Sequence, residues 1–126
     1  MASYLIDTHV LLWWLMDDPR LGASARQVIA RPSNEVWVSA ASGWEIAIKR
    51  ALGKLRAPDN LEARVAKEGF AFLPITFRHA EQAGVLPLIH RDPFDRMLIA
   101  QAQAEDLALI TADERIKCYA VRTLAA

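Results

Sequence analysis

The side chains best suited to chemistry are four acids spread along the chain: Asp7, Glu45, Asp95 and Asp113. Carboxylates that converge on one place repel one another and raise one another's pKa, so a cluster of anions needs positive charge among its members. Ligand sets made only of oxygen select hard cations such as Mg²⁺ or Mn²⁺. Such an ion can activate water and stabilise the leaving oxygen in phosphodiester cleavage, which is therefore the chemistry we expect if the four acids meet.

Other sources of positive charge are scarce around these acids. Arg91 and Arg96 flank Asp95 in the sequence, but we expect both to be flexible and solvated. The chain has three histidines and no HExxH or Cys–His spacing, which argues against zinc. A lone histidine is more often structural or exposed, so we assign no catalytic role to His9 or His90. A divalent cation remains the expected counter-charge.

Asp95 lies at the start of a predicted helix. Asp92 has the place of a helix N-cap, and Pro93 that of the first helical residue. Asp95 then falls in the first turn, on the same face as Leu98 and Ile99. It could complete a capping box and favour the positive end of the helix, or it could belong to a buried site, where an unpaired carboxylate is costly.

Glu45 is open to two interpretations. Helical spacing places it at the edge of an apolar stripe, near Ile48 and Leu52, where it could face a site. It could equally form a surface ion pair with Lys49, four residues along the helix. The sequence around Glu45 alone favours neither interpretation.

Two other stretches have functional and structural interpretations. Lys49, Arg50, Lys54 and Arg56 form the densest basic group, either a solvated helix end or a patch that contacts phosphates of a nucleic acid. The run Val10–Met16 is apolar all round and contains two adjacent tryptophans that point in different directions on a helix. Most of this run fits a buried helix, and we expect Trp13 or Trp14 to line a groove for a partner.

The predicted elements alternate between strands and helices. The expected strands are Tyr4–Ile6, Val36–Ser39, Phe70–Ile75, Leu107–Thr111 and Tyr119–Thr123, and the expected helices are Val10–Met16, Ser24–Ala30, Ala40–Leu52, Leu61–Glu68, Arg78–Val85 and Pro93–Glu105. This alternation predicts βα units around a mainly parallel sheet of four to five strands, with helices on both faces. Ligands of such sheets bind at the carboxyl ends of the strands, where Asp7 and Asp113 fall.

The bulk composition fits one globular domain, residues 1–126. Hydrophobic residues make up 53% and charged residues 24%, and 15 basic residues balance 15 acidic ones, so nucleic-acid binding must depend on a local patch. The start of the chain has no basic region typical of a signal peptide, and no apolar run is long enough to span a bilayer. With one cysteine, Cys118, these features predict a soluble cytoplasmic protein with no membrane association.

Four segments together resemble the signature of the PIN domain family. These are Ile6-Asp7-Thr8-His9, Ser39 six residues before Glu45, Asp95-Arg96-Met97-Leu98-Ile99-Ala100-Gln101-Ala102, and Leu109-Ile110-Thr111-Ala112-Asp113. The resemblance covers essentially the whole chain and is strongest to stand-alone bacterial VapC-type toxins of toxin–antitoxin pairs.

The resemblance implies a three-layer α/β/α fold and an endoribonuclease that uses Mg²⁺ or Mn²⁺. Asp7, Glu45, Asp95 and Asp113 would take the acidic positions of the family, with Thr8, Ser39, Thr111 and Asp92 in support. It also implies an RNA substrate, a homodimer and an antitoxin that blocks the site, often with a basic side chain. Our hypothesis for the roles is that Asp7 and Asp95 hold the principal ion, Glu45 orients or deprotonates water, and Asp113 completes the shell.

Two alternatives from other classes remain at this point. A signalling receiver domain also has an acidic Mg²⁺ site at strand ends, but it needs an acid after the third strand, where this chain has Leu73-Pro74-Ile75-Thr76. It also needs a lysine after the last strand, which this chain lacks. A PIN-like domain that binds without catalysis is the other alternative, and the presence of all four acids disfavours it.

Overall fold

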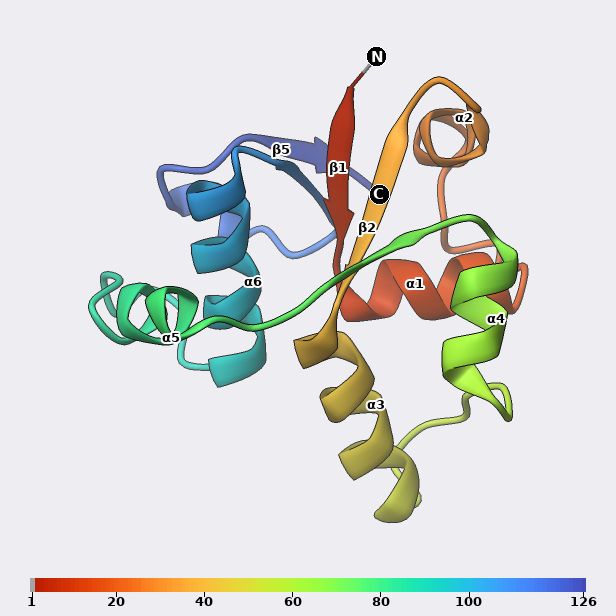
Figure 1. Ribbon diagram of the computed structural model, residues 1–126, viewed down its shortest axis with the longest axis horizontal. Helices are drawn as coiled ribbons and strands as arrows, with labels where there is room; N and C mark the ends of the chain where they lie inside the picture. Colours follow the sequence, from red (N-terminus) through yellow and green to blue (C-terminus); the bar gives the residue numbers. More distant parts are fainter. Residues whose placement is uncertain (1) are drawn as a thin grey trace.

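A five-stranded parallel sheet forms the centre of the computed structural model, which describes residues 2–126 (Figure 1). The strands are β1 (Ser3–Ile6), β2 (Glu35–Ser39), β3 (Ala71–Leu73), β4 (Ala108–Thr111) and β5 (Thr123–Ala125), in the order β3-β2-β1-β4-β5. In the centre, Leu5 of β1 is in register with Trp37 of β2 and Leu109 of β4. The predicted parallel α/β sheet is confirmed.

Six α-helices connect the strands: α1 (Thr8–Leu15), α2 (Ala23–Ala30), α3 (Ala40–Ala51), α4 (Leu61–Lys67), α5 (Phe77–Gly84) and α6 (Pro93–Glu105). Each lies within two residues of its predicted bounds. None of the helices in the described part of the chain is long and apolar enough to cross a membrane.

The strand side chains alternate between two cores, one on each face of the sheet. Ile6 and Ile110 pack into the core that α1, α2 and α4 cover, whereas Leu5 and Leu109 pack into the core formed with α5 and α6. Successive side chains of a strand point to opposite faces, so this division follows from the apolar runs themselves. The result is the three-layer α/β/α arrangement.

Helix α3 belongs to both cores. Its Ile46 packs with the α1 side, while its Ala41 packs with the α6 side. Figure 1 shows α3 extending from the end of β2 beneath the sheet, between α1 and α6. This position brings a side chain of α3 toward the carboxyl end of β1, which is important for Glu45.

The prediction for the last strand was wrong in position. Residues Ile116–Cys118 form a short 3₁₀ helix, and the strand comes later, at Thr123–Ala125. Tyr119 and the β-branched residues Val121 and Thr123 resemble a strand, but the Tyr119 hydroxyl donates to the Pro87 carbonyl oxygen at 2.7 Å. That tertiary bond holds Tyr119 in a connecting segment, and pairing with β4 begins only at Thr123.

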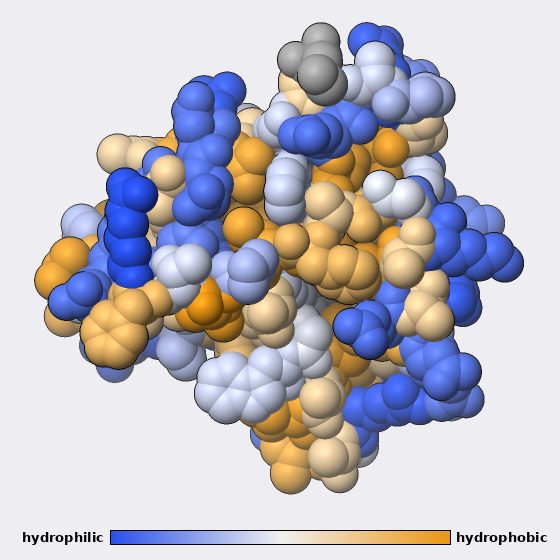
Figure 2. All heavy atoms as spheres, viewed as in Figure 1, coloured by the Kyte–Doolittle hydropathy of each residue, from blue (hydrophilic) through white to orange (hydrophobic). Residues whose placement is uncertain are grey.

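Apolar side chains are unevenly exposed on the surface. On the face shown in Figure 2, hydrophobic side chains lie along the middle and over α3 at the bottom, and hydrophilic ones gather on the right, over α4. Several large apolar residues are exposed, among them Trp44, Phe77, Val85 and Leu88. Phe77 and Val85 are both 83% exposed, so the surface around α5 is unusually apolar for a surface that only water contacts.

Candidate active site

The acids collect at the point where the strand order reverses. From β1 the chain adds β2 and β3 on one side of the sheet, and β4 and β5 on the other. Such a switch point leaves a crevice at the carboxyl ends of the two central strands, where open α/β sheets bind ligands. Asp7 directly follows β1, and Asp113 follows β4 by two residues.

Asp7 is fixed by hydrogen bonds and is only 5% exposed. Its backbone N–H donates to the Ile110 carbonyl oxygen at 3.1 Å, and its carboxylate accepts from the Val10 N–H at 2.9 Å, which makes Asp7 the N-cap of α1. Burial raises the pKa of Asp7, while hydrogen bonds from the Thr111 hydroxyl and from Val10 oppose that rise. The nearby charge of Asp113 raises the pKa further.

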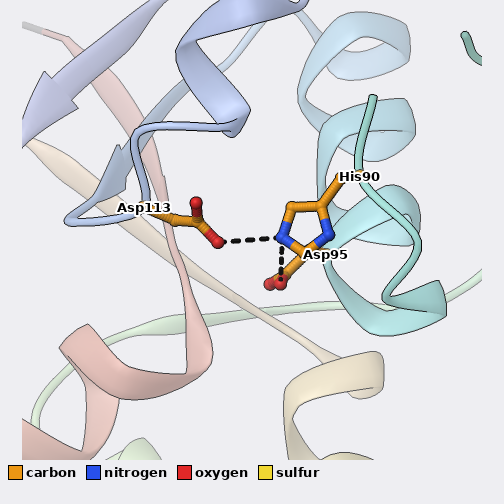
Figure 3. A group of neighbouring side chains, drawn as sticks. All are labelled: His90, Asp95 and Asp113. Atoms are coloured by element: carbon orange, nitrogen blue, oxygen red, sulfur yellow. Dashed lines mark hydrogen bonds and ion pairs between the residues drawn. The ribbon is translucent and has the colours of Figure 1, made fainter. Parts of the chain in front are cut away.

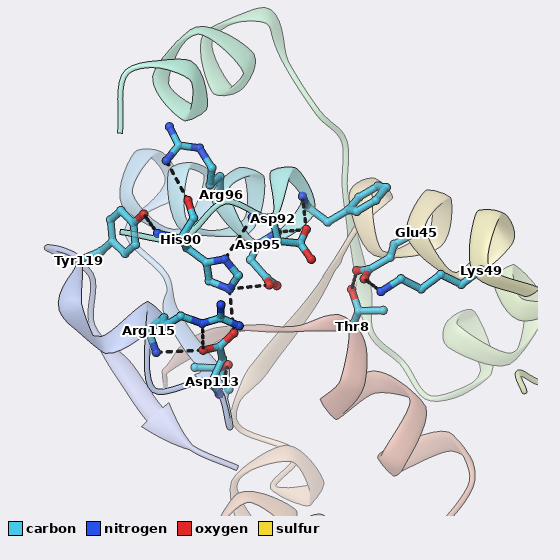
Figure 4. A network of polar contacts seen from close by, with 12 residues as sticks. Thr8, Glu45, Lys49, His90, Asp92, Asp95, Arg96, Asp113, Arg115 and Tyr119 are labelled. Carbon is cyan, nitrogen blue, oxygen red and sulfur yellow. Dashed lines mark hydrogen bonds and ion pairs between the residues drawn. The ribbon is translucent and has the colours of Figure 1, made fainter. Parts of the chain in front are cut away.

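Glu45 has a partner on each carboxylate oxygen (Figure 4). The Thr8 hydroxyl donates to Oε1 at 2.6 Å, and Nζ of Lys49 contacts Oε2 at 2.6 Å. The Lys49 ion pair is therefore real, but the interpretation as a surface pair is wrong, because Glu45 is only 3% exposed. The hydrogen bond to Glu45 raises the pKa of Lys49, and the charges of Asp92 and Asp95 add to the rise. Lys49 therefore lies within the electrostatic field of the acidic cluster.

Asp95 and Asp113 face each other across the imidazole of His90 (Figure 3). Nε2 of His90 lies 3.0 Å from Oδ2 of Asp95 and 2.8 Å from Oδ2 of Asp113. His90 is buried, whereas the side chains of Asp95 and Asp113 are 20% and 26% exposed. The structure therefore brings together two predicted acids and one residue to which the sequence had assigned no role.

The backbone fixes which nitrogen of His90 carries the proton. The Asp92 N–H donates to Nδ1 of His90 at 3.2 Å, so Nδ1 is an acceptor and Nε2 carries the hydrogen. Nε2–H therefore donates to the carboxylates and is not a lone pair offered to a metal. This use of the Asp92 N–H also means that Asp95 does not complete the capping box.

The predicted N-cap at Asp92 is confirmed. Its carboxylate accepts from the N–H of Phe94 at 2.8 Å and from that of Asp95 at 3.4 Å, with Pro93 in the first turn. A cap of this kind stabilises a helix by about 1 kcal/mol. It also fixes the start of α6, and thereby the direction in which Asp95 leaves it.

A buried scaffold holds the segment that carries His90. The Tyr119 hydroxyl accepts from the His90 N–H at 2.7 Å. The guanidinium of Arg96 donates to the carbonyl oxygens of His90 and Pro87, and also to those of Ala83 and Leu86. The expectation that Arg96 is flexible and solvated was wrong: it is 9% exposed, because it satisfies the carbonyls of the loop before α6.

The pKa of Asp95 is raised by burial and, to a smaller extent, by its acidic neighbours. Burial raises it from 3.8 to about 7, and the charge of Asp92 adds to the rise. His90 opposes this rise without cancelling it, and the charges of Asp7 and Glu45 reinforce it. The opposite holds for Asp113, where partial burial is outweighed by hydrogen bonds from His90 and the Arg115 N–H, so its pKa is lowered.

The donor chemistry fits a hard divalent cation. His90, Asp95 and Asp113 form a group whose possible ligand atoms lie within 4.8 Å of one another, and Asp7 lies near enough to raise the pKa of Asp95. With the proton of His90 on Nε2, the oxygens are the ligands that remain. The expectation that positive charge is scarce around the acids needs correction, since the Lys49 ammonium group and the His90 imidazole both contact acids of the cluster. They do not remove the need for a cation, because Asp95 still has a raised pKa.

The supporting residues fall into two groups. Thr8 and Thr111 contact the acids: Thr8 donates to Glu45, and Thr111 hydrogen-bonds Asp7 and accepts from the Asp113 N–H at 3.0 Å. Ser39 does not. It caps α3 by accepting from the Ala41 N–H, and its hydroxyl donates to Gln101 of α6. Ser39 therefore fixes α3 against α6 and acts on the site only through their positions.

The PIN domain family matches this sequence over residues 4–121. The chain belongs to the PIN domain family. One relative, "Ribonuclease VapC22" of Mycobacterium tuberculosis, is 32% identical over 127 residues, which cover 94% of this chain and 93% of the relative. Family membership excludes the receiver domain, whose phospho-accepting acid after the third strand is also missing here.

Solved structures share the fold of this PIN domain. A VapBC2 complex from Rickettsia felis, bound to a promoter DNA fragment, matches with a TM-score of 0.73 at 13% identity and covers 98% of each chain. A DNA-bound VapBC from Salmonella typhimurium matches with a TM-score of 0.69 at 17% identity, covering 99% of this chain and 98% of the other. At these identities the likeness establishes the fold, and the predicted three-layer PIN fold is confirmed.

The residues that sequence reasoning missed act across long separations. His90 meets Asp113, 23 residues away, and Tyr119 meets His90 across 29 residues. The only local signal was the position of His90 two residues before a helix cap, next to the Asp95 segment. Trp13 and Trp14 are both half-buried, and whether either contacts a partner stays a prediction.

Proposed function

We propose that this PIN domain is a metal-dependent endoribonuclease and the toxin of a toxin–antitoxin pair. The observation that carries the proposal is the carboxylate cluster at the switch point of the sheet, whose charge the chain's own groups leave uncompensated. The pKa of Asp95 is raised to about 7, first by burial and then by the charges of Asp92, Asp7 and Glu45. The relative named as a ribonuclease and the structural neighbours from toxin–antitoxin complexes support this assignment.

The division of roles starts from the oxygens that face the crevice. Asp7 and Asp95 would hold the principal ion, with Asp113 completing the shell directly or through water. Carboxylate oxygens favour Mg²⁺ or Mn²⁺. When bound, either ion supplies an activated water and stabilises the negative charge that develops on the phosphodiester.

Other residues of the site position the attacking water and the carboxylates that would hold the ion. Glu45 would orient the attacking water, and Thr8 and Lys49 fix its two oxygens. For Glu45 to take a proton, Lys49 must shift from Oε2, which would leave its ammonium group available to an oxygen of the scissile phosphate. Nε2–H of His90 holds Asp95 and Asp113 at a fixed separation before substrate arrives.

The expected protein partners follow from charge and surface. An antitoxin could block the site by offering a basic side chain to the same uncompensated carboxylates. A homodimer could cover the exposed apolar side chains Phe77, Val85 and Leu88. The proposed toxin is thus a single PIN domain, residues 1–126, that acts on RNA in the cytoplasm.

Purified protein incubated with RNA tests the activity directly. We expect cleavage with Mg²⁺ or Mn²⁺, none in EDTA, and recovery when the metal is restored. The matched control is Asp7→Asn, because asparagine still caps α1 and removes only the charge. Binding of RNA without cleavage under all metal conditions would contradict the proposal and favour the silent scaffold. Uptake of phosphate from a small donor would contradict both.

A further inference from the structure

A trough runs along α1, on the side that faces the segment after α3. Its walls are α1 and the segment that follows α3, and it encloses about 420 Å³. The lining residues of interest are His9, Trp13, Arg20, Lys54 and Arg56. It continues into a second hollow of about 640 Å³ that shares Met16, Leu55 and Arg56 with the first.

Each wall of the trough is joined through the chain to a partner of Glu45. On one side, His9 directly follows Thr8, whose hydroxyl donates to Glu45. On the other, the Lys54 N–H donates to the carbonyl oxygen of Lys49 at 2.8 Å, and the Lys49 ammonium group contacts Glu45. The trough and the acidic cluster are therefore linked through Thr8 and Lys49, although no acid of the cluster lines the trough.

One wall presents flat, conjugated groups in series. The rings of His9 and Trp13 lie one helical turn apart, with centroids separated by 6.3 Å. The guanidinium carbon of Arg20 lies 5.4 Å from the centroid of the Trp13 ring, and Asp18 holds that guanidinium with contacts of 2.7 and 3.1 Å. The Arg20 side chain is still 71% exposed. Unstacked bases of RNA bind to such aromatic rings and guanidinium planes.

The opposite wall presents uncompensated positive charge. Lys54 and Arg56 are exposed, and no ion pair between residues 2–126 includes either of them. By contrast, the neighbouring Arg50 pairs with Asp59. In a chain with zero net charge, two such cations opposite a row of flat groups make a local patch that fits a polyanion carrying bases.

We propose that this trough binds the single-stranded RNA segment next to the scissile phosphate. Bases stack on His9, Trp13 and Arg20, and phosphates contact Lys54 and Arg56. An acidic peptide could pair with the cations but has no bases to stack on the three flat groups, so RNA is the favoured occupant. The inference rests on the proposed function for the identity of the RNA as substrate, but it concerns binding, which can be measured without cleavage.

Binding of a labelled single-stranded RNA of about 12 nucleotides, followed by fluorescence anisotropy in EDTA, tests the trough. We expect Lys54→Ala/Arg56→Ala to weaken binding about 10-fold and to lower the slope of log affinity against log salt by about 1.4, the value for two lost phosphate contacts on a single strand. The matched control Arg31→Ala/Arg78→Ala removes two exposed cations elsewhere and should change neither quantity.

The stacking wall has a different signature. His9→Ala, at an exposed position, should weaken binding about 5-fold with an unchanged salt slope, because stacking does not release counterions. Trp13→Leu should do the same, provided that its melting temperature stays near that of the wild type, since Trp13 is half-buried.

The outcomes separate this inference from the proposed function. Wild-type RNA binding and salt slope in Lys54→Ala/Arg56→Ala, in a protein that cleaves RNA, would overturn the trough and leave the function standing. RNA binding that depends on Lys54 and Arg56, in a protein that never cleaves RNA, would support the trough and contradict the proposed function. No RNA binding, together with tight binding of a polyglutamate peptide that requires Lys54 and Arg56, would overturn the inference in favour of a protein-partner surface.

Discussion

The two halves of the candidate site are held together in different ways. In the β1–α3 half, formed by Asp7, Thr8, Glu45 and Lys49, the acids are buried and each has fixed hydrogen-bond partners. In the α6–β4 half, formed by His90, Asp95 and Asp113, the acids are partly exposed and share one imidazole N–H. The first half is therefore fixed by its own hydrogen bonds, whereas the second leaves carboxylate oxygens open to a ligand.

The difference shows where charge can change. Both oxygens of Glu45 are engaged by a hydroxyl and an ammonium group, so this carboxylate is balanced before any ligand arrives. Asp95, with a pKa of about 7, is close to half-protonated at neutral pH. We therefore expect a cation held by Asp7 and Asp95 to displace the proton of Asp95, while the Thr8 and Lys49 contacts of Glu45 stay as they are.

Asp7→Asn should have the largest effect on activity. It removes one charge from the cluster but keeps the cap on α1, so we expect at least about a 100-fold loss of RNA cleavage with a melting temperature close to that of the wild type. Asp92→Asn is the matched change, since it also replaces a capping aspartate by asparagine, next to the same cluster. It should lower cleavage by less than about 10-fold. Equal losses of cleavage for the two variants in single-turnover assays would contradict the separate roles of Asp7 as a metal ligand and Asp92 as a helix cap.

Asp95→Asn should stabilise the metal-free protein at neutral and alkaline pH but not at acidic pH. The pKa of Asp95 is raised in the folded state, so the unfolded chain loses this proton first as the pH rises. The stability that comes from the neutral carboxyl is fully present below about pH 4 and is lost by the time the pH passes about 7. Asparagine keeps it, so the variant should gain about 1 to 3 kcal/mol at pH 8 and almost nothing at pH 4.

Thermal unfolding in EDTA, followed across that pH range, measures the gain. With Mg²⁺ added, the wild type should recover the difference, because the ion replaces the missing counter-charge. A gain of the same size at pH 4 and pH 8 would contradict the assigned cause, since it would have nothing to do with ionisation of Asp95.

His90→Ala should destabilise the metal-free α6–β4 half. It removes a buried ring and the N–H that Asp95 and Asp113 share, and we expect a cost of about 2 kcal/mol at pH 8. The cost should be smaller at pH 5, where a protonated Asp95 can itself donate to Asp113. Differential unfolding with and without Mg²⁺ gives the measurement, and His90→Gln, which keeps an amide donor, gives the comparison. A pH-independent loss would assign His90 to packing alone.

The sequence predicted the β1–α3 half better than the α6–β4 half, for a physical reason. Asp7 at the end of an apolar strand and Lys49 four residues after Glu45 are local patterns, and the helix bounds were correct for the same reason. The burial of Glu45 depends on α3 crossing between α1 and α6, which no local pattern encodes, so the sequence could not decide between a site residue and a surface ion pair.

The α6–β4 half depends on contacts between distant segments. The role of His90 follows from a loop that Arg96 and Tyr119 hold in place, and neither contact has a periodic pattern in the sequence. The same tyrosine explains the misplaced last strand, because a hydrogen bond to Pro87 overrides the strand propensity of its neighbours. Where propensity and tertiary hydrogen bonds disagreed, the hydrogen bonds decided the structure.

Thr8→Val should have the smallest effect, and it tests whether the β1–α3 half is as balanced as its contacts imply. Valine has the shape of threonine but leaves Oε1 of Glu45 without its hydroxyl donor. Because Lys49 still neutralises the carboxylate, we expect a cost of only about 1 kcal/mol in thermal unfolding and a loss of cleavage of about 5-fold. Thr8→Ser keeps the donor and should restore cleavage. A loss of cleavage as large as that in Asp7→Asn would mean that Lys49 alone does not hold Glu45, and the β1–α3 half would then not be balanced by its contacts.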